Sequence, residues 1–194
     1  MLKFLLRGEF MPRLIGDNII LREFRKDDLP YINSFTTDYE ICRNLSDTFL
    51  RNHPLESTEK YLNSILENSS NDNLNYVIAE KDTLNYIGSI DIININWVSR
   101  IGTLGIVIPQ KESHNKGIGT EAITLLLKYS FERANLNKIE LDVNEFNLGG
   151  IRCYGKCGFV REGVIRESAY RDGKYYNVIK MGILKREFKE INLK

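Results

Sequence analysis

Residues 101–134 place a buried strand, a glycine loop and a helix in direct succession. The strand is predicted at 101–109, where the segment is short, rich in branched side chains and closed by Pro109. The loop, residues 114–122, contains Gly117 and Gly119 and leads into an amphipathic run at 123–134. A connection that contains a helix can join two parallel strands, which a tight turn cannot do. The stretch therefore predicts a sheet with a helical crossover.

The start of this predicted helix has the features of an anion-binding site. The first backbone N–H groups of a helix lack intrahelical partners, and the helix dipole adds about half a positive charge there. Gly117 and Gly119 put no side chain between these donors and a ligand, and Lys116 adds a full charge. A ligand that carries phosphate is therefore predicted. A tight strand-to-helix turn is the alternative; the P-loop and dinucleotide-loop spacings do not fit two glycines one residue apart.

The composition is that of an ordinary globular protein. Of the 194 residues, 42% are hydrophobic and 27% charged, and a net charge of +1 gives no general attraction to nucleic acid. Cys42, Cys153 and Cys157 lack metal-ligand spacing, which suits a cytoplasmic location, and Cys153 and Cys157 are predicted to be small packing residues. No membrane span is expected. Residues 1–10 are predicted to be a peripheral extension, and 11–194 a single domain.

Periodicity predicts the other elements. The predicted strands are 18–24, 74–80, 86–94, 101–109, 138–143, 159–170 and 175–184, and the predicted helices start at Lys26 or cover 37–44, 55–67, 123–134 and 147–157. An Asp-Gly turn at 171–174 joins the last two strands, and Gly158 ends the last helix in a left-handed conformation. We expect an α/β (α+β) fold, a mixed, mostly antiparallel twisted sheet of about seven strands with helices on both faces.

Residues 26–67 form an acidic segment. It holds eight acidic and four basic side chains, a net charge of −4. An acidic helical segment is most often a solvated face, and this interpretation comes first. The other interpretation is that the segment forms one wall of a site for a cationic molecule.

Three motifs in register resemble those of the GCN5-related N-acetyltransferase (GNAT) family. They are Leu104–Ile108 before the loop, the loop itself, and Asn147-x-x-x-Ile151-x-x-Tyr154-x-Lys156-x-Gly158-Phe159 after it. The loop resembles the pattern Q/R-x-x-G-x-G/A, although its first position is His114, and Gly149-Gly150 stands where the family usually has Arg-Ala. The resemblance covers about Leu14 to Leu184. The final hairpin is similar to that of the branch containing ribosomal-protein N-terminal and spermidine acetyltransferases.

The resemblance implies an acetyl-coenzyme A-dependent N-acetyltransferase that transfers the acetyl group directly to a primary amine and needs no metal. It implies that the strand at Ile106 diverges from its neighbour and pairs with the pantetheine arm, and that Tyr154 is the catalytic acid for the departing thiolate. The implied contacts to the co-substrate come from Ile106, Val107, Ile108, Asn115, Lys116, Gly117, Ile118, Gly119, Thr120, Asn147 and Tyr154. Tyr154 as a packing residue and Asn147 as a plain N-cap are the alternatives.

No general base is evident in the sequence. The candidates are His53, His114, Glu112, Asp91 and Glu23, none of which lies in a motif that gives it this role. Deprotonation of the amine through water is the preferred interpretation.

The acceptor and two other function classes stay open. The expected partner is a small-molecule amine or a protein N-terminus, with no nucleic acid and no membrane, and a homodimer is left open. A sensor or scaffold that binds acetyl-coenzyme A without turnover is the first alternative. A nucleotide-binding protein is the second, and the missing P-loop spacing argues against it.

Overall fold

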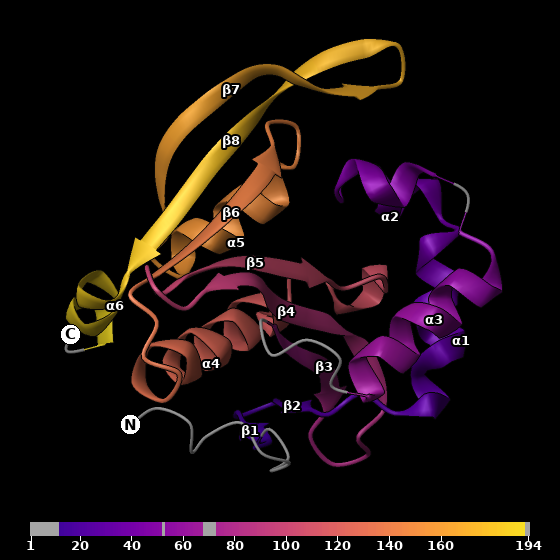
Figure 1. Cartoon of the computed structure of the whole chain (residues 1–194), viewed down its shortest axis with the longest axis horizontal. Helices are drawn as coiled ribbons and strands as arrows, with labels where there is room; N and C mark the ends of the chain where they lie inside the picture. The colour runs from indigo at the N-terminus through magenta and orange to yellow at the C-terminus, as the bar shows by residue number, and fades with distance from the viewer. Residues whose placement is uncertain (1–11, 52, 68–72, 193–194) are drawn as a thin grey trace.

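An eight-stranded sheet in the order β1-β2-β3-β4-β5-β6-β8-β7 forms the centre of the computed structural model, which describes residues 12–51, 53–67 and 73–192 (Figure 1). Its strands are β1 (Leu14–Ile15), β2 (Ile19–Arg22), β3 (Leu74–Glu80), β4 (Tyr86–Asn96), β5 (Ile101–Val107), β6 (Lys138–Asn144), β7 (Val160–Arg171) and β8 (Lys174–Leu184). Neighbouring strands are antiparallel except β5 and β6, which helix α4 connects. The predicted mixed, mostly antiparallel sheet is confirmed.

Helices cover both faces of the sheet, as the sequence predicted. The α-helices are α1 (Leu29–Thr36), α2 (Tyr39–Cys42), α3 (Leu55–Leu66), α4 (Ile118–Glu132), α5 (Leu148–Lys156) and α6 (Lys185–Asn192), and 3-10 turns lie at η1 (Lys26–Asp28), η2 (Asp47–Leu50) and η3 (Lys111–Ser113). Helices α4, α5 and α6 pack against one face and α1 and α3 against the other. In Figure 1, α1 and α3 lie together at the right of the sheet and α4 lies at the lower left.

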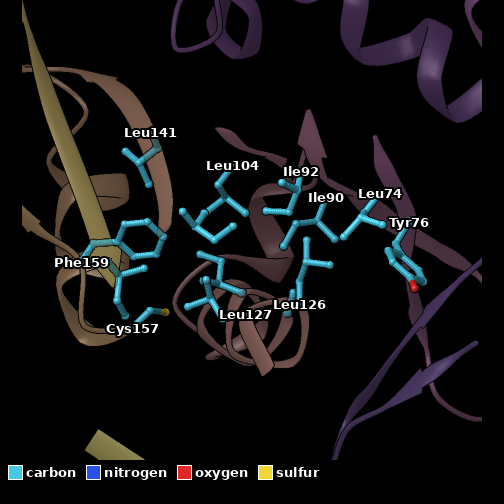
Figure 2. Packing of buried hydrophobic residues seen from close by; sticks show 14 of the residues in the cluster. Leu74, Tyr76, Ile90, Ile92, Leu104, Leu126, Leu127, Leu141, Cys157 and Phe159 are labelled. Carbon is cyan, nitrogen blue, oxygen red and sulfur yellow. The ribbon is translucent and has the colours of Figure 1, made fainter. Parts of the chain in front are cut away.

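The core consists of two layers because alternate strand residues point to opposite faces. On β3, Tyr76 and Ile78 face α4, whereas Val77 and Ala79 face α1 and α3. Figure 2 shows the larger layer, in which leucines of α4 meet branched side chains of β4 and β5. All of these side chains are fully or almost fully buried. The two faces of the sheet therefore pack against different helices and form two separate core layers.

Two local signals were predicted correctly. Asp172 and Gly173 have φ angles of 52° and 80°, the left-handed pair that a two-residue hairpin turn requires. Gly158 has a φ angle of 94° directly after α5, where a left-handed residue closes a helix. Both positions agree with the boundaries of the final hairpin.

The sequence prediction missed strand β1 and helix α6, and it gave seven strands in place of eight. Strand β1 has only two residues, too few to show a period. Helix α6 follows β8 without a break, and its Phe188 is buried with its ring centroid 5.4 Å from that of Phe131. The predicted peripheral extension, residues 1–10, lies outside the described residues. Within the described part, no helix combines the length and apolar character that a membrane crossing requires.

Candidate active site

Strands β5 and β6 pair at one end and separate at the other. Their ladder runs only from Ile101 opposite Lys138 to Thr103 opposite Glu140. Beyond Thr103, β5 stays paired with β4, and β6 with β8 (Figure 1). The edge of β5 from Leu104 to Val107 is therefore not hydrogen-bonded to β6, and its backbone groups on that side are available to a bound chain.

The glycine loop leads from the end of β5 to the start of α4. Gly117 is the N-cap of α4 with a φ angle of 82°, and a Cβ atom there would meet nothing within 4 Å. The space beside Gly117, at the start of the helix, is therefore open. Glu121 lies in the first turn of α4, but its carboxylate accepts a hydrogen bond from the backbone N–H of Asn18 at 2.9 Å. Burial acts to raise the pKa of Glu121, but hydrogen bonds from Asn18 and Ile19 lower it, so the charge is held away from the loop.

The side chain of His114 connects the loop to the residue that follows β5. Its Nε2 lies 2.7 Å from the carbonyl oxygen of Ile108, so this nitrogen carries the hydrogen and donates it. The predicted strand runs to Pro109, but β5 ends at Val107, two residues earlier, so Ile108 lies outside it. Pro109 cannot donate to a ladder, which explains the early end. The side chain at the first position of the loop motif thus binds the protein itself.

Gly119 lies where α4, α5 and the end of β5 meet. A Cβ atom at this position would lie 3.3 Å from Sγ of Cys153 and 3.6 Å from Cδ1 of Ile108. The hydroxyl of Thr120 lies 3.6 Å from the same sulfur. The structure therefore brings the predicted loop, strand end and helix together. Cys157 is buried in the core, as predicted for a packing residue.

Asn147 and Tyr154 lie at the start and on the inner side of α5. The side chain of Asn147 caps the helix by accepting a hydrogen bond from Gly150 N–H at 2.9 Å, so the N-cap interpretation is confirmed. Tyr154 is half-buried against the main core cluster, with its ring centroid 6.0 Å from that of Phe159. Within the described residues its hydroxyl has no hydrogen-bond partner. Burial, with the nearby Cys153 and Cys157, raises the pKa of Tyr154, which keeps the hydroxyl protonated.

Among the candidate bases, only Asp91 combines burial with an unpaired oxygen. Glu23 is hydrogen-bonded to Arg13, an interaction that lowers the pKa of Glu23 to about 2. Glu112 is exposed. Nε2 of His53 lies 2.8 Å from the carbonyl oxygen of Thr48. Burial raises the pKa of Asp91 to about 6, and the Gly105 N–H offsets only part of this shift.

A contact between α2 and the tip of the final hairpin was not predicted. Arg43 forms an ion pair with Asp172 at 2.8 Å, and its guanidinium lies 5.3 Å from the ring centroid of Phe146. The hydroxyl of Tyr39 donates to the same aspartate. Buried Arg171 adds an ion pair with Asp47 at 2.8 Å. These partners are more than a hundred residues apart in sequence, so no local pattern could indicate the contact.

A pocket of about 260 Å³ lies between this region and the sheet. It is lined by Tyr31, Ser34, Phe35, Asp38, Ile41, Tyr86, Pro109 and Gln110. The rings of Tyr31 and Tyr86 stack at 5.4 Å. Pro109 and Gln110 follow Ile108 just after the end of β5, so the pocket lies near the separated strands. Within the described residues, no group of three or more His, Cys, Asp or Glu side chains could hold a metal ion.

The family model described as "Acetyltransferase (GNAT) domain" matches residues 18–160. This chain is a member of the GNAT acetyltransferase family. The match extends from β2 through α5 to the start of β7, so it includes the loop, the separated strands and Tyr154. The expected GNAT membership is confirmed.

Individual relatives agree with this assignment. The Vibrio cholerae spermidine N(1)-acetyltransferase is 30% identical over 90% of this chain and 97% of its own length. The putative ribosomal N-acetyltransferase YdaF of Bacillus subtilis is 32% identical over 52% of this chain and 55% of its own length. A crystal structure of the V. cholerae spermidine N-acetyltransferase in complex with CoA and spermine superposes with a TM-score of 0.78 at 28% identity, covering 89% of this chain and 98% of that one.

This GNAT protein is thus an acetyl-coenzyme A-dependent N-acetyltransferase that acts on an amine. The alternative of a sensor or scaffold without turnover is not favoured, because relatives matching nearly the whole chain carry the names of acetyltransferases.

Proposed function

We propose that the acceptor is a polyamine such as spermidine, acetylated at a primary amine. The observation that carries the proposal is the V. cholerae relative, a spermidine N(1)-acetyltransferase that matches over 97% of its own length. The ribosomal relative matches only 55% of its own length, which gives a protein N-terminus less support. The acidic segment 26–67 adds a physical reason, since a polyamine carries several positive charges at neutral pH.

In this proposal the diphosphate of acetyl-coenzyme A lies at the start of α4. Gly117, Ile118, Gly119 and Thr120 supply backbone N–H groups, and exposed Lys116 supplies a positive charge. Two observations support the placement: the space in front of Gly117 is open, and the one carboxylate of the first turn is bound elsewhere. Asn115, with a φ angle of 61°, turns the chain into the loop.

The pantetheine arm lies in the opening between β5 and β6. The unpaired edge of β5 at Ile106 and Val107 offers backbone donors and acceptors, much as a strand would to its neighbour. One backbone N–H there stabilises the oxyanion that develops on the thioester oxygen. Ile108 closes the end of the opening beside Gly119, and Asn147 lines it from the start of α5.

Tyr154 is the proton donor for the leaving thiolate in this proposal. The amine nitrogen attacks the carbonyl carbon and the new C–N bond forms. The C–S bond breaks, the sulfur takes the phenolic proton, and the proton that the nitrogen loses restores the phenol. The hydroxyl has no hydrogen-bond partner in the described residues, and burial raises its pKa, so it carries a proton at neutral pH. A cytoplasmic location belongs to the same proposal and is supported by the three free thiols.

The test is a comparison of amine classes by release of coenzyme A thiol. Spermidine, a short peptide with a free N-terminus and an aminoglycoside are compared at equal acetyl-coenzyme A concentration. The highest kcat/KM is expected for spermidine, with one acetyl group added to a primary amine as shown by mass spectrometry. A kcat/KM for the peptide at least about tenfold above that for spermidine would replace the polyamine by a protein N-terminus.

A further inference from the structure

Cys153 and Cys157 lie four residues apart on α5 and at its end, and both contact the first turn of α4. Sγ of Cys153 lies 3.6 Å from the hydroxyl of Thr120 and 3.3 Å from the place of a Cβ atom at Gly119. Sγ of Cys157 lies 3.7 Å from the carbonyl oxygen of Thr120, and in Figure 2 it points toward α4. The two thiols therefore meet α4 at the same residue, and the acetyl transfer described above uses neither of them.

The two thiols differ in exposure and in acidity. Cys153 is half-buried, whereas Cys157 is buried in the core. A hydrogen bond from the Cys157 thiol lowers the pKa of Cys153; burial opposes this shift, and a hydrogen bond from Thr120 adds to it. The same thiol–thiol hydrogen bond, together with burial, raises the pKa of Cys157. Cys153 is therefore the more accessible and more nucleophilic sulfur, and Cys157 is a second thiol in direct contact with it.

The end of α5 has the freedom that a bond between these sulfur atoms requires. Four residues along a helix rise about 6 Å, and the Cα atoms of a disulfide lie up to about 6.8 Å apart. Cys157 is the C-cap, so it lies just outside the helix, and Gly158 follows it with a φ angle of 94°. Gly155 lies in the last turn, where glycine costs a helix about 1 kcal/mol relative to alanine. The last turn of α5 therefore opens at little cost.

We propose that Cys153 and Cys157 form a reversible disulfide that switches acetyl transfer off when a peroxide is present. The Cys153 thiolate attacks one peroxide oxygen, the O–O bond breaks, and a Cys153 sulfenic acid and hydroxide are formed. The Cys157 sulfur then attacks the sulfenic sulfur. An S–S bond forms, the S–O bond breaks, and the hydroxyl leaves as water with the Cys157 proton. The two sulfur atoms are oxidised and the peroxide is reduced, and a thiol reductant restores both thiols.

The disulfide acts on acetyl transfer through the residues around it. This inference rests on the proposed function, in which Tyr154 protonates the thiolate and the first turn of α4 holds the diphosphate. Tyr154 directly follows Cys153, and its ring centroid lies 6.0 Å from that of Phe159, two residues beyond Cys157. Opening the last turn of α5 moves this ring, and drawing Cys153 toward Cys157 removes its contact with the start of α4.

The third cysteine provides an internal control. Cys42 is buried, its Sγ lies 3.3 Å from the carbonyl oxygen of Phe35, and burial raises its pKa. It therefore lacks the exposure and the acidity that make Cys153 reactive.

The test is oxidation of the reduced enzyme by hydrogen peroxide, followed by mass spectrometry. Trypsin cleaves after Arg152 and Lys156, so it releases Cys153 and Cys157 in separate peptides that only a disulfide links. We expect this linked pair, a protein mass lower by two hydrogen atoms, and a kcat/KM at least about tenfold lower. Dithiothreitol should restore kcat/KM. The rates are measured with the best acceptor of the three amine classes, and the peptide mapping needs no acceptor.

Three serine variants assign the steps. Cys153→Ser removes the attacking sulfur and should keep its kcat/KM through the peroxide treatment. Cys157→Ser removes the second thiol and should leave a sulfenic acid at Cys153, which dimedone traps. Cys42→Ser should be inactivated and reactivated like the wild type.

Oxidised wild-type enzyme without the linked peptides overturns the proposal, as does a linked pair with unchanged kcat/KM. Inactivation of Cys153→Ser as fast as the wild type also overturns it. If a serine variant does not fold, the wild-type mapping and its reversal by dithiothreitol decide. An enzyme that acetylates the peptide and not spermidine refutes the polyamine proposal alone, because the disulfide and its effect are then measured with the peptide.

Discussion

Gly119 lies in a tightly packed part of the first turn of α4. A Cβ atom there would touch the sulfur of Cys153 and the end of Ile108. Gly119→Asp would add both bulk and a negative charge among donors that we assign to a diphosphate. We expect the affinity for acetyl-coenzyme A, measured by calorimetry, to fall by at least about 100-fold. Inhibition by free coenzyme A should weaken in the same way.

Gly119→Asn separates charge from bulk, since Asn has nearly the same shape as Asp and no charge. It should weaken binding clearly less than Gly119→Asp. Equal losses in both variants would mean that Gly119 matters for packing against Cys153 alone. Near-wild-type affinity in Gly119→Asp would remove the diphosphate from this loop.

Tyr154 packs against the core, and its hydroxyl has no hydrogen-bond partner among the described residues, so the packing and the catalytic interpretation both stay open. Tyr154→Phe keeps the ring and removes the proton. If the hydroxyl protonates the thiolate, kcat should fall by about 10²- to 10⁴-fold, while KM for acetyl-coenzyme A changes little. If Tyr154 has only a packing role, kcat should stay unchanged. Steady-state kinetics and the melting temperature of this one variant distinguish the two.

At the scale of elements, the sequence predicts what is periodic and local. Strand β3 covers Leu74–Glu80, the bounds predicted from its apolar and β-branched run. The Asp172-Gly173 turn was predicted because only certain residues adopt positive φ at both positions. Strand β1 was missed because its two residues depend on pairing with β2.

The contact of α2 with the β7–β8 hairpin is an element-scale feature that the sequence does not contain. It holds the acidic side of the site next to Phe146 through Arg43 and Asp172. Arg43→Gln removes both the ion pair and the stacked cation. We expect KM for the acceptor to rise about three- to tenfold, with unchanged affinity for acetyl-coenzyme A, because a partly buried pair contributes about 1 kcal/mol.

The exposed Arg51 provides the matched control for this variant. Arg51→Gln removes the same charge from the same helical region and should leave KM within about twofold of wild type. If Arg43→Gln also leaves KM unchanged, α2 does not help to form the acceptor site.

At the scale of the whole molecule, the co-substrate side of the site could be predicted better than the acceptor side. The loop, β5 and α5 follow one another in sequence and carry motifs, so their residues were named in advance. In our proposal the acceptor side is formed by β4, α1, α2 and the hairpin, which meet only in three dimensions. Asp91 was only one candidate among five acids and histidines, because its contact with Gly105 across two strands leaves no trace in either segment.

The acidic side chains of residues 26–67 act together at the scale of the whole molecule, and in the structure they fall into two groups. Asp28, Glu40 and Asp47 form ion pairs with arginines. The other five acids of the segment are exposed and make no ion pair with another described residue: Asp27, Asp38, Glu56, Glu59 and Glu67. Lys26, Arg51 and Lys60 of the same segment are also exposed and make no ion pair with another described residue, so an excess of two negative charges remains to attract a polyamine.

Salt screens exposed charges over about 10 Å at about 0.1 M ionic strength, so the attraction should depend on salt. At saturating acetyl-coenzyme A, KM for spermidine should rise severalfold between about 50 mM and about 300 mM NaCl. Glu56→Gln should reduce the slope of this dependence, whereas Glu132→Gln, which removes an exposed charge at the far end of α4, should not. A KM that is flat over this range would mean that the segment is only a solvated face, and that selectivity for a cationic acceptor resides in buried groups, where salt screens far less.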